Sequence, residues 1–328
     1  MDDRPNPRRW GLTVPLNDGP LHSQEPMIRR LEELGYTDLW SAEAMGVDGL
    51  TPLVLGSQWA PTLRLGTAIL PAFTRGPALM AQTVAGMCEA APGRFVLGLG
   101  TSSNVIVENW NSVEFSEPYK RTRDMVRFLR QALTGEKVTE TYDTFEVKGF
   151  RLHARIEQQP KILVAALREG MLRMAGRESD GAILNWLAPD DLETIVPIVR
   201  NENPDAELAA RIFVVPTEDA DVARAVARFL IGAYVNVPVY RAFHEWMGRT
   251  DALQEHWDLW AAGDRKAAMA AIPDSLIDDL VVHGSGPQCT ARIREYMDKG
   301  VDTAAIAIVM GSGTSDADAI ELLRPDDS

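Results

Sequence analysis

The sequence predicts an α/β protein whose strands close into a (β/α)8 barrel, the TIM-barrel architecture, with a helical insertion between strands 7 and 8. Two observations predict this fold. Strand-like and helix-like segments alternate eight times along the 328 residues. The segment 95–99 is an apolar run without alternation, which is typical of a strand buried on both faces in a parallel sheet. A doubly wound open sheet is the alternative that the same alternation allows.

The first four strand–helix units are expected between residues 10 and 133. Each predicted helix carries an apolar stripe at three- and four-residue spacing, as Met27, Leu31 and Leu34 do in the first one. The four strands are predicted at 10–16, 38–43, 63–70 and 94–100. The other three helices are expected around 50–60, along Ala78, Ala81, Ala85 and Cys88, and along Met125, Leu129 and Leu133.

The remaining four strands are predicted at 161–167, 181–187, 208–215 and 303–310. A helix reaching Arg177 follows the first of these, and another begins at about Asp190. Four glycines stand where a helix ends and a strand begins: Gly35, Gly93, Gly181 and Gly300. Each suits a left-handed helix C-cap, because a residue without Cβ avoids the steric penalty there.

The segment from about 220 to 283 breaks this alternation. It is helical in pattern and rich in aromatic residues, with no clear strand. We therefore predict one barrel domain spanning 1–328, with 220–283 as its insertion. The insertion could be a lid over the site or a simple packing surface.

Composition limits the partners. The net charge of −14 argues against nucleic acid or an anionic membrane as the main partner. Cys88 and Cys289 lie far apart and are expected to be buried thiols in a reducing compartment. The N-terminus MDDRPNPRRW has no apolar core, and no segment approaches a membrane span. We expect a cytoplasmic protein.

Residues 94–111 contain the most informative segment. The apolar strand ends in Gly98 and Gly100, and four hydrogen-bonding residues, 101–104, follow. This pattern is typical of a ligand site, although a strand with a plain polar loop is the alternative. A dinucleotide fingerprint is discounted, because Ser103 stands where the third glycine belongs and 105–115 is not expected to start a helix.

Reactive residues of a barrel come from the C-terminal ends of its strands. Those ends carry one carboxylate, Glu43, and several neutral hydrogen-bonding groups, but no histidine. No metal site is predicted, since the five histidines lack metal-ligand spacing, and there is no nucleophile elbow or P-loop. Few ionisable groups around an apolar floor suit an organic cofactor that carries the difficult chemistry itself.

The fifth strand predicts an anion site. The chain turns from strand into helix at about Arg168, where free backbone N–H groups and a guanidinium would meet a phosphate. Glu169 would oppose the phosphate if it pointed inward. A solvated surface arginine is the alternative for Arg168.

Six segments together resemble the bacterial luciferase-like monooxygenase superfamily, in its branch that uses the 8-hydroxy-5-deazaflavin coenzyme F420. They span most of the chain in the family's order. The segments are GYTDLWSAE (35–43), LRLGTAI with FTRGPALMAQ (63–69, 73–82), GRFVLGLGTSSNVIVENWN (93–111), AALREGMLRMAGRESDGAILNWL (165–187) and VPVYRAFHEWMG (237–248).

The resemblance implies a ring site at the strands' C-terminal ends. A non-prolyl cis peptide behind the ring is expected at Ala68–Ile69, while Pro71-Ala72 stands where relatives often have Asn-Pro. Glu43 matches a polar or catalytic position, and Asn185 matches a position that faces the pocket. The implied contacts with the ring and tail are Thr101, Ser102, Ser103 and Asn104, and those with the phosphate are Leu167 and Arg168.

The leading hypothesis is an oxidoreductase that transfers a hydride between reduced coenzyme F420 and a small organic substrate. Glu43 would donate the proton, unless it is a structural carboxylate paired with a neighbour such as Arg75. The alternatives are an FMNH2-dependent monooxygenase and a non-catalytic flavin-binding protein. A homodimer is expected.

Overall fold

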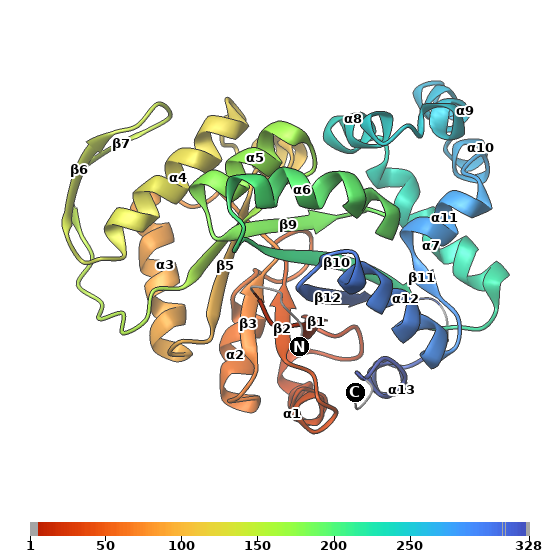
Figure 1. The fold of residues 1–328 in the computed structure, drawn as a ribbon, viewed down its shortest axis with the longest axis horizontal. Helices are drawn as coiled ribbons and strands as arrows, with labels where there is room; N and C mark the ends of the chain where they lie inside the picture. The colour runs from red at the N-terminus through yellow and green to blue at the C-terminus, as the bar shows by residue number, and fades with distance from the viewer. Residues whose placement is uncertain (1–5, 310, 312, 326–328) are drawn as a thin grey trace.

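Eight parallel strands form a closed barrel in the computed structural model, which describes residues 6–309, 311 and 313–325 (Figure 1). Each strand pairs with the next, and the last pairs with the first through Thr303 and Arg9, which closes the ring. This confirms the predicted (β/α)8 barrel. The strands are β1 Arg9–Val14, β2 Asp38–Ser41, β3 Arg64–Thr67, β5 Phe95–Gly100, β8 Lys161–Ala165, β9 Gly181–Asn185, β10 Glu207–Val215 and β12 Thr303–Ile308, and the two-residue β4 Leu70–Pro71 pairs with β5.

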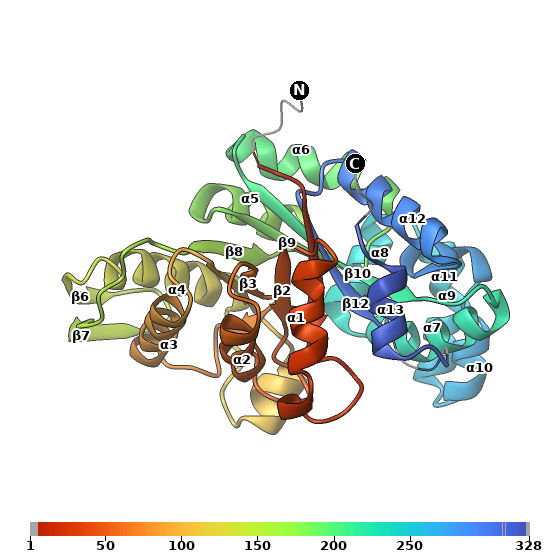
Figure 2. The ribbon, with the colours of Figure 1, turned by 90° about the horizontal axis from the view of Figure 1, so that it is seen from below.

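The barrel helices lie outside the strands (Figures 1 and 2). They are α1 Glu25–Glu33, α2 Thr51–Trp59, α3 Pro77–Ala90, α4 Pro118–Ala132, α5 Glu169–Glu178, α6 Leu192–Glu202, α12 Gly286–Asp298 and α13 Asp316–Leu322. Cys88 and Cys289 are both free and buried, as expected. Met310, the end of the predicted eighth strand, and the first five residues lie outside the described residues.

Two of the four predicted glycine caps have different roles. Gly35 and Gly300, with positive φ values of 84° and 115°, directly follow the C-cap residues of α1 and α12 as predicted. Gly93 has a positive φ of 71° but lies two residues beyond the C-cap Ala91 of α3, in a turn that the Arg94 N–H closes on the Ala91 carbonyl. Gly181, at φ 151°, instead starts β9, and a Cβ there would lie 1.9 Å from the carbonyl oxygen of Glu207. This glycine is therefore required by the close approach of β9 and β10.

Two segments depart from the sequence expectations. Val105–Trp110 forms a turn of π-helix, so the expectation that no helix starts after Asn104 was wrong. Its fully buried Val107 explains why packing overrides the weak local propensity. The second segment is an unpredicted hairpin, β6 Lys137–Thr141 and β7 Glu146–Arg151, whose aromatic side chains pack on Phe128 of α4.

The predicted insertion consists of five helices between β10 and the two-residue β11 Val282–His283, which pairs with β10. They lie on the opposite side of the molecule from the β6–β7 hairpin (Figures 1 and 2). The helices are α7 Ala220–Tyr234, α8 Pro238–Trp246, α9 Thr250–Ala261, α10 Arg265–Ala270 and α11 Asp274–Leu280. Among the described residues no single helix is long and apolar enough to cross a membrane; α7 and α8 pass that test only as a pair bent by 108°.

Trp40 fills the middle of the barrel. A Cβ on Gly66 would lie 2.4 Å from its indole ring, and a Cβ on Gly11 would lie 2.7 Å from it, so both neighbouring strands need glycine there. The interior is thus a packed core. It consists of Trp40, Ala68, Val96, Leu163, Ile183, Ala209 and Ala305.

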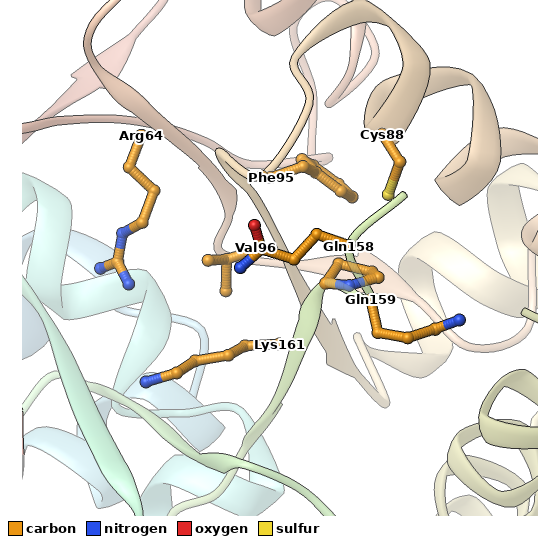
Figure 3. Close-up of a pocket in the computed structure, with 9 residues that line it drawn as sticks. Arg64, Cys88, Phe95, Val96, Gln158, Gln159 and Lys161 are labelled. Atoms are coloured by element: carbon orange, nitrogen blue, oxygen red, sulfur yellow. The ribbon is translucent and has the colours of Figure 1, made fainter. Parts of the chain in front are cut away.

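An ionic network closes the N-terminal end of the barrel. Asp38 binds Arg9 at 2.8 Å and Arg64 at 2.5 Å, while Glu207 binds Arg64 at 2.7 Å and Lys161 at 2.8 Å. Burial alone would raise the pKa of Glu207, but the two cations lower it to about 2. The hollow in Figure 3 adjoins this network and is lined by residues that include Arg64, Lys161 and Cys88. It therefore lies at the end of the barrel opposite to the one where barrel enzymes carry their chemistry.

The Glu207 contacts predict a dependence of stability on pH. The pKa of Glu207 is lower in the folded chain than its ordinary 4.5, so its stabilisation is complete above pH 4.5 and is lost as the pH falls toward 2. We expect a contribution of about 3 kcal/mol at pH 7, of which about 2 kcal/mol is lost at pH 3. Urea unfolding of the wild type and of Glu207→Gln measures this contribution as the difference between their free energies of unfolding at each pH.

Glu146→Gln is the control, since this carboxylate is exposed on the β6–β7 hairpin. Its pH dependence should match that of wild type. If the free energies of unfolding of wild type and Glu207→Gln differ by the same amount from pH 7 to pH 3, the stabilising role assigned to the ionic network is wrong.

Candidate functional site

The C-terminal ends of five neighbouring strands bring the predicted site residues into one arc. The Glu43 backbone N–H donates to the carbonyl of Ile69 at 3.2 Å, which joins the loop after β2 to the segment after β3. The Ala68–Ile69 peptide is cis and non-prolyl, at the position expected from the resemblance. Asn185 ends β9, further along the same arc.

Small side chains make the floor of this arc flat. A Cβ on Gly100 would lie 2.9 Å from Ile69 Cγ1 and 3.0 Å from Ala165 Cβ. A Cβ on Gly98 would lie 1.7 Å from the carbonyl oxygen of Thr67. The ends of β3, β5 and β8 therefore touch one another with little between them, and Ile69 and Ala165 remain partly exposed.

The polar loop after β5 leaves hydrogen-bonding groups available. Ser102 has a positive φ of 61°, and Ser103 Oγ accepts a bond from the Ile106 backbone N–H at 3.3 Å. Within the described part of the chain, the side chains of Ser102 and Asn104 make no hydrogen bond. The loop therefore offers a hydroxyl and an amide to a ligand.

The predicted anion site lies at the start of α5. Arg168 is the exposed residue just before the helix, and its side chain has no ion-pair or hydrogen-bond partner among the residues described. Glu169 is bound to Arg173 at 2.8 Å, so its charge is neutralised within the helix. Together with partly exposed Leu167, the turn leaves the free N–H groups of α5 and one guanidinium available to an anion.

Glu43 forms the pair that the sequence offered as its alternative. Both its carboxylate oxygens accept hydrogen bonds from Arg75, each at 2.7 Å, and Oε2 also accepts from the Gly49 N–H at 3.2 Å. Both side chains are about four-fifths buried. The carboxylate therefore acts as an acceptor that fixes the loop between β2 and α2.

Six residues, which we call the mouth ring, face the arc from β9, β10 and the insertion. Each of them contacts at least one other member: for example, Asn185 Nδ2 donates to Tyr240 Oη at 2.7 Å, and Trp186 stacks on Phe213 with ring centroids 3.8 Å apart. The ring is Asn185, Trp186, Phe213, Arg211, Tyr240 and Tyr234. It joins helices α7 and α8 to the barrel, so the insertion contributes to the site.

The mouth ring contains buried polar atoms without partners. In the described chain, Asn185 Oδ1, Trp186 Nε1 and Arg211 Nε have no hydrogen-bond partner. Burial raises the pKa of Tyr240 to about 12, so its phenol is neutral at ordinary pH. Unpartnered polar groups are costly to bury, which is typical of a binding site.

Sequence reasoning found Asn185 but missed Arg211, and it gave Tyr240 no role in the site. One signal was present: Arg211 is the only charged residue inside the apolar strand 208–215. The pairing of Tyr240 with Asn185 joins residues 55 positions apart and had no local signature.

Comparison with known proteins gives consistent matches over nearly the whole chain. A family model described as luciferase-like monooxygenase matches residues 9–303. A Mycobacterium tuberculosis protein named as a coenzyme F420-dependent oxidoreductase is 29% identical, over 84% of this chain and 86% of its own. The 5,10-methylenetetrahydromethanopterin reductase of Methanolobus tindarius is 26% identical, over 89% and 91%.

A solved structure shares the fold. The coenzyme F420-dependent tetrahydromethanopterin reductase of Methanopyrus kandleri superposes with a TM-score of 0.79, covering 97% of each chain at 20% identity. The barrel and its helical insertion therefore form an architecture that is also found in another protein.

The Glu43–Arg75 pair predicts a measurable coupling energy. A double-mutant cycle with Glu43→Gln and Arg75→Gln should give about 1–3 kcal/mol in urea unfolding, because the pair is bidentate and largely buried. The exposed pair Arg241–Glu245 on α8 is the control, with about 0.3–0.5 kcal/mol expected. Equal coupling in the two cycles would show that Glu43 is not held by Arg75.

Proposed function

The chain belongs to the luciferase-like monooxygenase family, and on that premise we propose that it is a coenzyme F420-dependent oxidoreductase acting on a small organic substrate. The observation that carries the proposal is the arc of site residues at one barrel end, from Glu43 to Asn185. The names of relatives that match 84–89% of the chain support it further.

The residues of the arc fit this cofactor. The flat floor of Ile69, Gly100 and Ala165 suits a planar ring, because Gly100 places no side chain between Ile69 and Ala165. The unpaired Arg168 beside the N-terminus of α5 suits a phosphate. Ser102 and Asn104 would hydrogen-bond the polar groups of the cofactor that lie between its ring and its phosphate.

When bound, the deazaflavin supplies or accepts the hydride. The chain's own residues then have to orient the substrate, exclude water and manage one proton. Helices α7 and α8 would exclude water, since Tyr234 and Tyr240 pack against Trp186 and Asn185 over the strand ends.

The proton has two candidate sources at the mouth. Glu43 was the donor expected from the sequence, but both its oxygens accept bonds from Arg75. Tyr240 Oη accepts a hydrogen bond from Asn185, and among the described residues its own hydroxyl proton has no acceptor. We therefore assign proton donation to Tyr240 Oη and a positioning role to Glu43.

Binding of the cofactor tests the proposal without a known substrate. Titration of the protein with coenzyme F420 should quench the cofactor's fluorescence, and FMN should bind at least tenfold more weakly. Arg168→Gln should weaken F420 binding about tenfold or more, since a charge-assisted bond to the phosphate is lost. Arg151→Gln, exposed on the β6–β7 hairpin, is the matched control and should leave the affinity unchanged. Tight FMN binding without F420 binding would overturn the proposal in favour of the FMN-dependent alternative.

If Tyr240 donates the proton, substitutions of Tyr240 and of Glu43 should lower kcat by different amounts. In F420-dependent turnover of a substrate found among small aldehydes, ketones and enones, Tyr240→Phe should lower kcat about 100-fold or more. Glu43→Gln should lower it less than tenfold. Tyr142→Phe, whose hydroxyl bonds Gln131 near the hairpin, is the control. A large loss of kcat in Glu43→Gln with full activity in Tyr240→Phe would show that Glu43, and not Tyr240, donates the proton.

A further inference from the structure

Arg211 is a partly buried arginine that has no acidic partner among the described residues. Arg64 and Arg249, by contrast, are paired with carboxylates: Arg64 with Asp38 and Glu207, and Arg249 with Asp191. The Arg211 guanidinium lies over the Phe213 ring, 5.1 Å from the ring centroid. Burial lowers the pKa of Arg211, and the phenols of Tyr234 and Tyr240 partly oppose this shift.

The strand pattern turns Arg211 toward the inside of the barrel. Ala209, two residues earlier on β10, belongs to the packed interior, whereas Ala210 and Ile212 pack outward against the helices. Side chains alternate along a strand, so Arg211 lies on the inner face one step nearer the C-terminal end. Its register neighbours there are Asn185 on β9 and Ala305 on β12.

The guanidinium can be reached from the mouth. Arg211 keeps part of its surface accessible although its Nε is buried and unpartnered. Its register neighbour on β12 is the small residue Ala305, and the next inward-facing position on that strand is Ala307. A charge in such a position needs a counterion, because an unpaired buried charge is costly.

We propose that Arg211 binds the substrate, and that the substrate is an organic carboxylate with a flat, apolar body. The proposal rests on the proposed function, because it names the substrate class of the same site. Arg211 and Trp186 Nε1 would supply donors to the carboxylate, while Trp186, Phe213 and Tyr234 would contact the body.

Charge and position favour a substrate carboxylate over two other anions. A phosphate carries nearly two charges, and the mouth ring holds a single cation, which matches a monoanion better. The cofactor's phosphate has its own cation in Arg168, which follows β8, whereas Arg211 lies on β10 beyond β9. The two arginines thus serve different parts of the mouth.

Calorimetric titration with benzoate, benzamide and phenyl phosphate tests this assignment. The wild-type protein should bind benzoate at least tenfold more tightly than benzamide, and more tightly than phenyl phosphate. Arg211→Gln should remove the preference for benzoate over benzamide, and Arg211→Lys should retain part of it. Arg265→Gln is the matched control, since Arg265 also stacks on an aromatic ring, Trp260 at 3.8 Å, but is exposed on α10.

F420 titration of the same variants separates this proposal from the proposed function. Arg211→Gln should bind F420 with wild-type affinity and should unfold at the same urea concentration as wild type. Equal binding of benzoate and benzamide by wild type, tighter binding of phenyl phosphate, or F420 affinity lost in Arg211→Gln would overturn the substrate assignment. If wild type does not bind F420 but still prefers benzoate over benzamide through Arg211, the proposal that F420 is the cofactor is overturned. Arg211 then remains a carboxylate site.

Discussion

Trp40 is the side chain on which the architecture of the site depends. It occupies the barrel's middle, and the strands on either side accept it only because they carry Gly11 and Gly66. Below it, the ionic network around Asp38 and Glu207 closes the N-terminal end. With the middle filled and the base closed, the barrel interior is open to ligands only at the C-terminal ends of the strands.

That end is divided chemically into two halves. The half formed by β2, β3, β5 and β8 has a flat floor, a polar loop and one exposed cation, Arg168. The half formed by β9, β10 and the insertion has aromatic rings and the partly buried Arg211, and some of its buried polar atoms have no hydrogen-bond partner among the described residues. A cofactor and a substrate need these two different surfaces side by side, because hydride transfer requires the reacting atoms to be in contact.

The sequence predicted the barrel well because its signals are local. Apolar runs, helical stripes and glycine positions such as Gly35 and Gly300 are set by the residues nearby in the chain. Resemblance to a family added the cis peptide at Ala68–Ile69, which no periodicity could indicate. The π-helix at 105–110 was missed because buried packing of one valine outweighs local propensity.

The site was predicted more completely in one half than in the other, where only Asn185 was among the predicted contacts. Residues that directly follow strands, such as Glu43 and Arg168, can be read from strand ends, and the Arg75 partner was a sequence-based alternative. The mouth ring depends on α8 reaching β9 and β10, which is a tertiary contact without sequence signature.

The most direct test of the account is a crystal structure of the protein soaked with coenzyme F420. We predict density for a deazaflavin ring against Ile69 and Gly100, with its phosphate at Arg168 and the side of the mouth near Arg211 left open. Cofactor density at the Arg211 side, or none at the C-terminal ends of the strands in crystals soaked at saturating concentration, would contradict it.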